Sequence, residues 1–324
     1  MKATLHRWRP WLKRGALLAF FAVVASLLVL QAHSMDRPEV LAARKGYPLR
    51  SLGLAGVLAA ASLALYSCFD LLGRHCTGHT LATPTVMTVT FISYVFNLNL
   101  GSLVGGVAFR FRLSTSLGLA KGLITRILTL SMVTNWTGYL LVAGLVFSIP
   151  PPTLPDDWLV NAFHLRWIGN VLVSVAAAYL ALCALSAKRA FAMRGYTIPL
   201  PSARLAALQL AMGATNWLIM SGIVFVLLQQ RVAFPVVVSV LMLVGIAGVI
   251  THIPAGLRVL EAVFVALFSS QLPKPAIVAA LVAYRVIYYG ASLGVAATAY
   301  VAMEARAKKL AVYTAPSAAG TAKT

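Results

Sequence analysis

Two short segments of the chain combine helix-breaking residues with charges in long apolar surroundings. In residues 251–262, Pro254 and Gly256 interrupt an apolar run, and Arg258 and Glu261 follow them three positions apart. Charged side chains at membrane depth cost about 2.5 to 3.5 kcal/mol each on insertion scales, so they are rare there and mark functional positions. A helix that starts after such a break presents amides that favour an anionic group. We therefore expect an anion site here, with Glu261 either neutralising Arg258 or carrying a proton.

The second segment, residues 85–109, is apolar enough to enter a membrane but is interrupted in its middle and at its end. The interruptions and the basic residues that follow are Asn97, Asn99, Gly101, Gly105, Gly106, Arg110 and Arg112. The paired glycines permit close backbone approach, and the two guanidinium groups can each hold a phosphodiester through parallel hydrogen bonds. The alternative is that the arginines only fix the topology at a membrane edge.

Further arginines lie in apolar surroundings later in the chain. Arg126 follows the basic stretch after the second segment, and Arg285 stands next to Tyr284. Arg285 lies about ten residues inside its predicted helix, which is too deep for its head group to reach the interface easily. We therefore count Arg126, Tyr284 and Arg285 among the candidate substrate-binding residues.

Two other groups of polar residues have ordinary structural interpretations. Asp70 and Arg74 are four positions apart, which is the spacing of an ion pair at the end of a helix. His75, Cys76 and His79 could be drawn as a metal site, but three ligands in a short loop without a fourth are more typical of a loop at the membrane edge. We expect no metal site.

Composition indicates a protein that is embedded in a membrane over most of its length. Of 324 residues, 60% are hydrophobic and 10% are charged, whereas soluble domains carry about 25% charge. The net charge of +20 comes from lysines and arginines in short segments between apolar runs, as in cytoplasmic loops. Such loops can bind anionic lipid head groups. No basic segment is interleaved with stacking aromatic residues, so we expect no nucleic-acid partner.

The sequence predicts an all-α polytopic membrane protein with about eight transmembrane helices and one re-entrant broken segment. Residues 85–109 should return to the cytoplasmic side, because a crossing there would place most later basic loops outside. The first helix, residues 15–30, is too long for the apolar part of a signal peptide, so we expect it to be retained. The predicted crossings are residues 15–30, 51–72, 123–149, 167–185, 205–228, 234–250, 253–269 and 276–303.

With both termini in the cytoplasm the number of crossings must be even, so residues 253–269 should cross as well. If residues 253–269 turn back instead, the basic C-terminal tail lies outside. Residues 1–14 then form a basic cytoplasmic tail, residues 15–305 the helical domain, and residues 306–324 a basic, disordered tail.

The triplet Thr-Asn-Trp occurs twice, at residues 134–136 and 215–217, on two helices that are parallel in this topology. Repeats with broken helices are a common way to build a site at the bilayer midplane. A coincidence of residues that are common at membrane helix interfaces remains the alternative.

Catalysis by this chain has little support. Only seven acidic residues are present, and there is no nucleophile–base arrangement, P-loop or zinc-protease helix. We expect neither an enzyme nor a bound cofactor.

The motifs together resemble a known family. Residues 92–99, leading to Gly105-Gly106 and to Arg110-Phe111-Arg112-Leu113, and residues 252–262 are similar to the two signatures of the lysylphosphatidylglycerol synthase transmembrane family. Residues 134–139 and 283–289 add to the resemblance, which is nearest to a group of bacterial inner-membrane proteins within that family. Arg258 stands where many relatives have a second glycine, which puts its part in head-group binding in question.

The resemblance implies the flippase-like membrane half of that family. Two-domain relatives add a soluble acyltransferase-like domain, and we expect none here. We predict a translocase of anionic or modified glycerophospholipids in the bacterial inner membrane. The alternative is a non-transporting scaffold or regulator that partners a phospholipid-synthesis enzyme or forms a homodimer.

The predicted topology places residues 110–126 in the cytoplasm. A cysteine introduced there, in a variant that lacks Cys68, Cys76 and Cys183, should react with a membrane-impermeant maleimide only after the inner membrane is permeabilised. Mass-tag labelling of intact and permeabilised spheroplasts checks this expectation. Labelling of intact spheroplasts would contradict the topology.

Overall fold

A computed structural model describes residues 48–149, 162–186, 190–193, 196–251 and 259–313 of the chain. All of them belong to one unit, Pro48–Thr324. These residues are helical except for turns and one short antiparallel hairpin of β1 (Ala190–Met193) and β2 (Tyr196–Pro199). The predicted helix at residues 15–30 lies outside the described residues.

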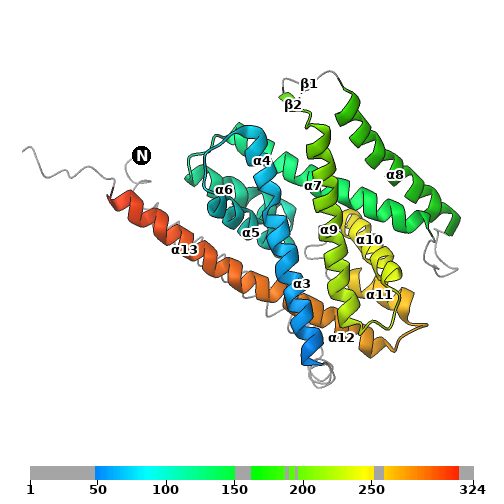
Figure 1. Ribbon diagram of the computed structural model, residues 1–324. Helices are drawn as coiled ribbons and strands as arrows, with labels where there is room; N and C mark the ends of the chain where they lie inside the picture. Colours follow the sequence, from blue (N-terminus) through cyan, green and yellow to red (C-terminus); the bar gives the residue numbers. More distant parts are fainter. Residues whose placement is uncertain (1–47, 150–161, 187–189, 194–195, 252–258, 314–324) are drawn as a thin grey trace, which may run out of the picture. The chain divides into compact units, whose positions relative to one another are not determined.

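Among the described residues, five helices are long and apolar enough to cross a membrane. They correspond to five of the predicted crossings, which confirms the all-α membrane fold. In Figure 1 they are α3 (Leu49–Ser67) continued by α4 (Phe69–Thr77), α7 (Lys121–Ser148), α8 (Ala162–Leu185), α9 (Ala203–Leu227), and α12 (Lys274–Tyr284) continued by η3 (Arg285–Ala291) and α13 (Ser292–Tyr313).

Helices α7 and α9 cross at two glycines. A Cβ atom on Gly138 would lie 2.1 Å from the carbonyl carbon of Gly213, and one on Gly213 would lie 2.2 Å from the Thr134 carbonyl oxygen. Trp217 Nε1 donates to the Asn135 carbonyl at 3.3 Å. Since Thr134 meets Gly213 and Asn135 meets Trp217, the helices run parallel, as predicted. The two Thr-Asn-Trp triplets therefore meet at a small-residue crossing, which is a common way for membrane helices to pack.

Helix α8 packs on α7 through a second close approach. A Cβ atom on Gly144 would lie 2.6 Å from the Val173 side chain, and one on Gly169 would lie 2.8 Å from the Ser148 backbone. The rest of α8 is mostly exposed and apolar, including Phe163 and Trp167. Such a surface suits contact with lipid chains.

The chain reverses direction between α5 (Thr83–Leu100) and α6 (Phe109–Ser116). Gly101 has φ +84°, a left-handed conformation that glycine adopts without strain. The π-helix η1 (Ser102–Ala108) then packs back on α5, where a Cβ atom on Gly105 would lie 2.1 Å from the Phe96 carbonyl oxygen. Leu81 before α5 and Leu117 after α6 line the same pocket. The segment therefore leaves and returns at one end of the bundle, as predicted for a re-entrant hairpin.

A second pair of short helices precedes the last span. Helix α10 (Phe234–Thr251) packs against α11 (Val259–Phe268), and α11 packs against α12. The ten residues of α11 rise about 15 Å, about half of a hydrocarbon core of roughly 30 Å. The predicted crossing at 253–269 stays a prediction, because residues 252–258 lie outside the described part of the chain.

The end of the last helix differs from the expected boundary. Helix α13 continues to Tyr313, so residues 306–313 are helical and not the disordered chain predicted from residue 306. The physical reason is composition, because alanine, lysine, arginine and leucine are good helix formers and nothing in this stretch breaks a helix.

The close packing of η1 on α5 predicts the effect of a substitution at Gly105. Gly105→Ala should lower the melting temperature of the purified protein, because the added Cβ meets backbone atoms that must move. Overpacking of this kind costs about 1 to 3 kcal/mol. Thermal denaturation in detergent measures the effect, with Gly122→Ala as the control, since nothing lies within 4 Å of a Cβ at that position. Equal melting temperatures for the two variants would contradict the close approach.

Candidate functional site

The first buried ion pair joins α4 to α6, the returning arm of the helical hairpin formed by α5, η1 and α6. Arg110 Nη1 lies 3.2 Å from Asp70 Oδ1, and the two side chains are 4% and 5% exposed. Thr90 of α5 donates its hydroxyl to Asp70 Oδ2 at 2.8 Å. The fold-back therefore brings Arg110 to Asp70, and three elements meet at one carboxylate. Because an unpaired charge would be very costly in this apolar interior, each partner holds the other in place.

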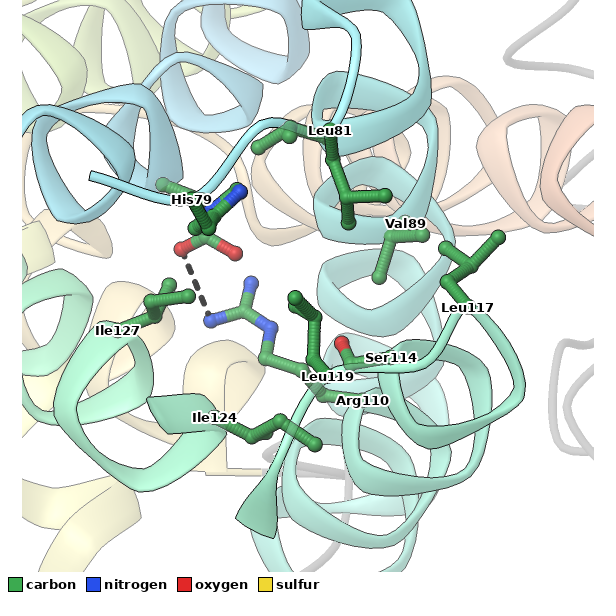
Figure 2. Close-up of a pocket in the computed structure, with 11 residues that line it drawn as sticks. His79, Leu81, Val89, Arg110, Ser114, Leu117, Leu119, Ile124 and Ile127 are labelled. Carbon is green, nitrogen blue, oxygen red and sulfur yellow. Dashed lines mark ion pairs between the residues drawn. The ribbon is translucent and has the colours of Figure 1, made fainter. Parts of the chain in front are cut away.

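A pocket lies beside this pair, near the loop between α4 and α5. Its walls include His79 of that loop, Ser114 of α6 and Ile127 of α7. Figure 2 shows the Arg110 guanidinium inside the pocket with the ion pair as a dashed line and His79 close to it. Among the described residues of the second segment and the last span, neither Glu261 nor Arg285 lines this pocket.

The second ion pair joins α11 to the last span. Arg285 Nε lies 2.7 Å from Glu261 Oε1, and Arg285 Nη2 donates to Glu261 Oε2 at 2.8 Å. One guanidinium thus contacts both carboxylate oxygens, through a hydrogen bond from Nη2 and through an ion-pair contact from Nε that lacks hydrogen-bond alignment. The Arg285 side chain is 5% exposed and that of Glu261 27%. The partner of Glu261 is thus Arg285, and Arg258, the neighbour considered from the sequence, lies outside the described residues.

Both arginines stand at a π-helix. Arg285 is the first residue of η3, and Arg110 follows the last residue of η1 by two positions. π-Helical turns are rare and occur often at functional positions, because they change the direction of side chains within a helix. The two sites therefore share a π-helix as well as a buried pair of an arginine and a carboxylate.

A hydrogen-bonded chain of side chains crosses the interior near these pairs. Ser62 Oγ donates to Asn216 Oδ1 at 2.8 Å and lies 2.9 Å from the Tyr288 hydroxyl. The Tyr288 and Tyr94 hydroxyls are 3.1 Å apart. Since each hydroxyl carries one proton, the bonds run in one direction, from Tyr94 to Tyr288, to Ser62 and to Asn216. The chain joins α5, η3, α3 and α9.

Stacked aromatic rings extend this chain towards both ion pairs. The Tyr66 ring stacks on Tyr94 with 3.4 Å between centroids, and Tyr66 interacts electrostatically with Arg110 and Asp70. Tyr289 contacts Tyr288 edge-on with 5.8 Å between centroids. Tyr289 in turn interacts electrostatically with the second pair, Glu261 and Arg285. The hydroxyl chain is thus flanked by aromatic rings on both sides, by Tyr66 next to Tyr94 and by Tyr289 next to Tyr288.

The glycine and asparagine candidates have local roles in the structure. Gly105 and Gly106 face the end of α5, where a Cβ on Gly106 would lie 3.1 Å from Asn97 Oδ1. Asn99 Nδ2 donates to the Val95 carbonyl at 2.8 Å. The close approach predicted for the glycines is therefore within the protein, to backbone atoms at Gly105 and to the Asn97 side chain at Gly106. Contact between Asn97, Asn99 or the glycines and a substrate stays a prediction.

The remaining candidates are distributed over the fold. Arg112 forms an exposed ion pair with Glu304 at 3.3 Å and lies over the Tyr300 ring, 5.7 Å from its centroid. Arg126 is exposed on α7. Tyr284 is buried and stacks on Tyr288 near the second pair, with centroids 5.5 Å apart. Pro254, Gly256 and Arg258 lie outside the described residues.

Some residues at the site were not selected from the sequence. Asp70 was predicted to pair with Arg74, but Arg74 instead donates to the Leu81 carbonyl and to Thr83 Oγ1. The prediction was wrong because the fold brings Arg110, which is distant in the sequence, close to Asp70. Local sequence spacing cannot indicate such a contact. Three other residues of the site lie within motifs identified in the sequence but were not selected as candidates, namely Tyr94, Asn216 and Tyr288.

Apolar spans, an internal helical hairpin and paired charges in the interior define a multi-pass helical membrane protein. The chain belongs to the family of the inner membrane protein YbhN, so it is a multi-pass protein of the inner membrane. It is 44% identical over 311 residues to "Inner membrane protein YbhN" of Escherichia coli (strain K12), covering 96% of this chain and 98% of that protein.

A more distant relative is the "Uncharacterized protein slr0712" of Synechocystis sp., 28% identical over 293 residues, which covers 87% of this chain and 91% of the relative. No family model matches the chain.

The first pair yields a stability prediction. Asp70→Asn should lower the melting temperature strongly, because removal of one partner of a buried pair costs about 3 to 5 kcal/mol. The double variant Asp70→Leu/Arg110→Met should recover most of that loss, since no charge is left unpaired. Thermal denaturation in detergent distinguishes these outcomes.

The matched control is Glu304→Gln, which breaks the exposed pair with Arg112 and should cost under about 1 kcal/mol. If Asp70→Asn were as mild as Glu304→Gln, the buried pair would not hold the hairpin.

Proposed function

We propose that the protein is an inner-membrane phospholipid translocase for anionic or modified glycerophospholipids and has no catalytic step of its own. The observation that carries the proposal is a repeated arrangement. Two buried arginines, Arg110 and Arg285, each stand at a π-helix and are each held by one carboxylate. A protein that only spans the membrane has no need of such charges.

The chemistry of the pairs fits a phosphodiester. A guanidinium presents its donors in a planar fork that binds a carboxylate or a phosphate through two parallel bonds. A lipid phosphate can therefore replace Glu261 at Arg285 without leaving the guanidinium unpaired. The partial exposure of Glu261, 27%, gives that carboxylate room to move away while Arg285 stays buried.

The resemblance to the lysylphosphatidylglycerol synthase transmembrane family supports the same proposal. The residues that carry it include Tyr94, Arg110, Glu261 and Arg285, and these are residues of the two ion pairs and of the hydroxyl chain. We propose that the chain corresponds to the lipid-translocating half of that family. We also propose that both termini are cytoplasmic, on the basis of the basic loops.

A second candidate function is a non-transporting scaffold for a phospholipid-synthesis enzyme or a second copy of the chain. The observation in its favour is that both buried arginines are already paired with carboxylates. A scaffold needs no exchange of these partners, whereas a translocase does. The two candidates therefore differ in whether lipid reaches the arginines.

Reconstitution tests the translocase directly. Liposomes that contain the protein and a fluorescent phosphatidylglycerol should lose more than the outer-leaflet signal when dithionite is added, and empty liposomes should not. Arg285→Lys keeps the charge but not the two parallel bonds. Loss of a bond to a charged group costs about 1.5 to 3 kcal/mol, so the translocation rate should fall roughly 10- to 100-fold.

The matched control is Arg231→Lys, which changes an exposed loop arginine that donates to Gln229 Oε1. It should translocate at the wild-type rate. Equal bleaching in protein-containing and empty liposomes would contradict the translocase and leave the scaffold candidate. Equal rates for Arg285→Lys and Arg231→Lys would remove Arg285 from the lipid path.

A further inference from the structure

The pocket beside the first ion pair contains polar atoms that have no hydrogen-bond partner. Asp70 Oδ1, Arg110 Nε and both ring nitrogens of His79 are buried and accept or donate no hydrogen bond to any residue that the structure describes. The contact of Asp70 Oδ1 with Arg110 at 3.2 Å is an ion pair without good hydrogen-bond alignment. Buried polar atoms are nearly always satisfied in proteins, so each such atom calls for an explanation.

The size of the cavity limits what can satisfy these atoms. Its volume is about 20 Å³, which is enough for a water molecule and too small for a phosphate group. The walls other than the polar groups are apolar, including Val89, Ile124 and Ile127. The cavity therefore suits water and a proton, while an anionic head group would have to take the place of the Asp70 carboxylate.

His79 connects this cavity with the loop that follows α4. Burial lowers the pKa of His79, the positive charge of Arg74 lowers it further, and the Asp70 carboxylate partly opposes both effects. The folded protein therefore favours neutral His79 at pH 7. A neutral imidazole that is only partly exposed can take up a proton from water and pass it on.

The charged and titratable groups around Asp70 come from every neighbouring element. Helix α6 contributes Arg110, and the chain of α4 and its loop contributes Arg74 and His79. Helix α3 contributes Tyr66 and α5 contributes Tyr94 and the donor Thr90. The charged residues of α7 and α9, which are Lys121, Arg126 and Arg204, are exposed. Arg110 is thus the positive group that directly opposes the Asp70 carboxylate.

We propose that Asp70 is the proton-binding site of the translocase, and that a lipid phosphodiester binds Arg110 only as Asp70 takes up a proton through His79. The proposal rests on the proposed function and names the proton as the ion whose uptake is coupled to lipid binding.

The step is balanced in protons and charge. A proton from water binds a ring nitrogen of His79, the N–H bond breaks, and an O–H bond forms on Asp70 Oδ1. The pair of Asp70 and Arg110 changes from neutral to a net charge of +1, and the phosphodiester of charge −1 restores neutrality. Departure of the lipid and of the proton returns Asp70 to Arg110. One proton therefore accompanies one lipid.

Proton uptake on lipid binding tests the proposal without any transport assay. The full chain in detergent is titrated by calorimetry with dioctanoylphosphatidylglycerol in two buffers of different ionisation enthalpy, from pH 5.5 to 8.5. The wild type should take up at most one proton per bound lipid. Its affinity for the lipid should fall as the pH rises, by up to tenfold per pH unit in the range where protons are taken up. Dimethyl phosphate in a parallel titration shows whether the bare phosphodiester suffices or the lipid is required.

Three variants separate the proton site from a structural role. Asp70→Asn should bind lipid without proton uptake and with an affinity that does not depend on pH. Thr90→Val removes the hydrogen bond to the Asp70 carboxylate, so the pH midpoint of lipid binding should move upward. This variant keeps both charges and serves if Asp70→Asn does not fold. His75→Gln changes an exposed histidine on the same helix and should match the wild type.

The outcomes are distinct. Lipid binding without proton uptake in the wild type, or proton uptake that persists in Asp70→Asn, would overturn the proton site and leave the translocase standing. An unchanged pH midpoint in Thr90→Val would also overturn it. Absence of lipid binding at every pH would overturn the proposed function, and the proton site with it.

Discussion

An arginine in the apolar interior of this protein has to be paired, and that requirement organises the structure around α4, α5 and α6. Arg110 is buried with Asp70, and Thr90 donates a hydrogen bond to the second oxygen of the carboxylate. Removal of two charges from water costs several kcal/mol per ion, so this pair does not stabilise the fold as an apolar contact would. We infer that the pair instead selects one arrangement, because any other docking of α6 would leave both buried charges unpaired. Gly101 and Gly105 make that arrangement sterically possible.

Arg285 is paired in the same way with Glu261, but this second pair is more exposed to solvent. The first pair is buried on both sides, whereas Glu261 is partly exposed. Tyr94 and Tyr288 lie between the pairs and contribute hydroxyls that bond in one direction. Buried hydrogen bonds of this kind tend to rigidify the groups that they join. The two pairs and the hydroxyls between them are therefore the buried polar groups on which the proposed lipid translocation rests.

The sequence was sufficient to predict the class of fold and the depth of the main charges. Long apolar runs predicted five spans that the structure contains, and charge balance across the loops predicted the return of residues 85–109. Glu261 and Arg285 stood out because charges so deep in apolar runs are expensive. Their pairing was not predicted, because α11 and the last span meet only in three dimensions.

Other features depended on contacts between segments far apart in the chain. Asp70 has Arg74 one helical turn away, and local spacing therefore favoured the wrong partner. Periodicity indicates which face of a helix is apolar but not which hydroxyls meet, so the bonds of Tyr288 to Ser62 and Tyr94 could not be foreseen. The paired glycines did signal a close approach, but the group that Gly105 approaches is the carbonyl of Phe96, within the protein itself.

The central claim is that buried arginines exchange a carboxylate for a lipid phosphate, and the distance between the two groups tests it most directly. Solid-state NMR can measure dipolar coupling between ¹⁵N-labelled guanidinium groups and ³¹P in proteoliposomes that contain phosphatidylglycerol. The account predicts a coupled guanidinium signal that is lost in Arg110→Gln or in Arg285→Gln and kept in Arg204→Gln, which changes an exposed arginine of α9. Identical couplings in the wild type and in both buried-arginine variants would contradict it.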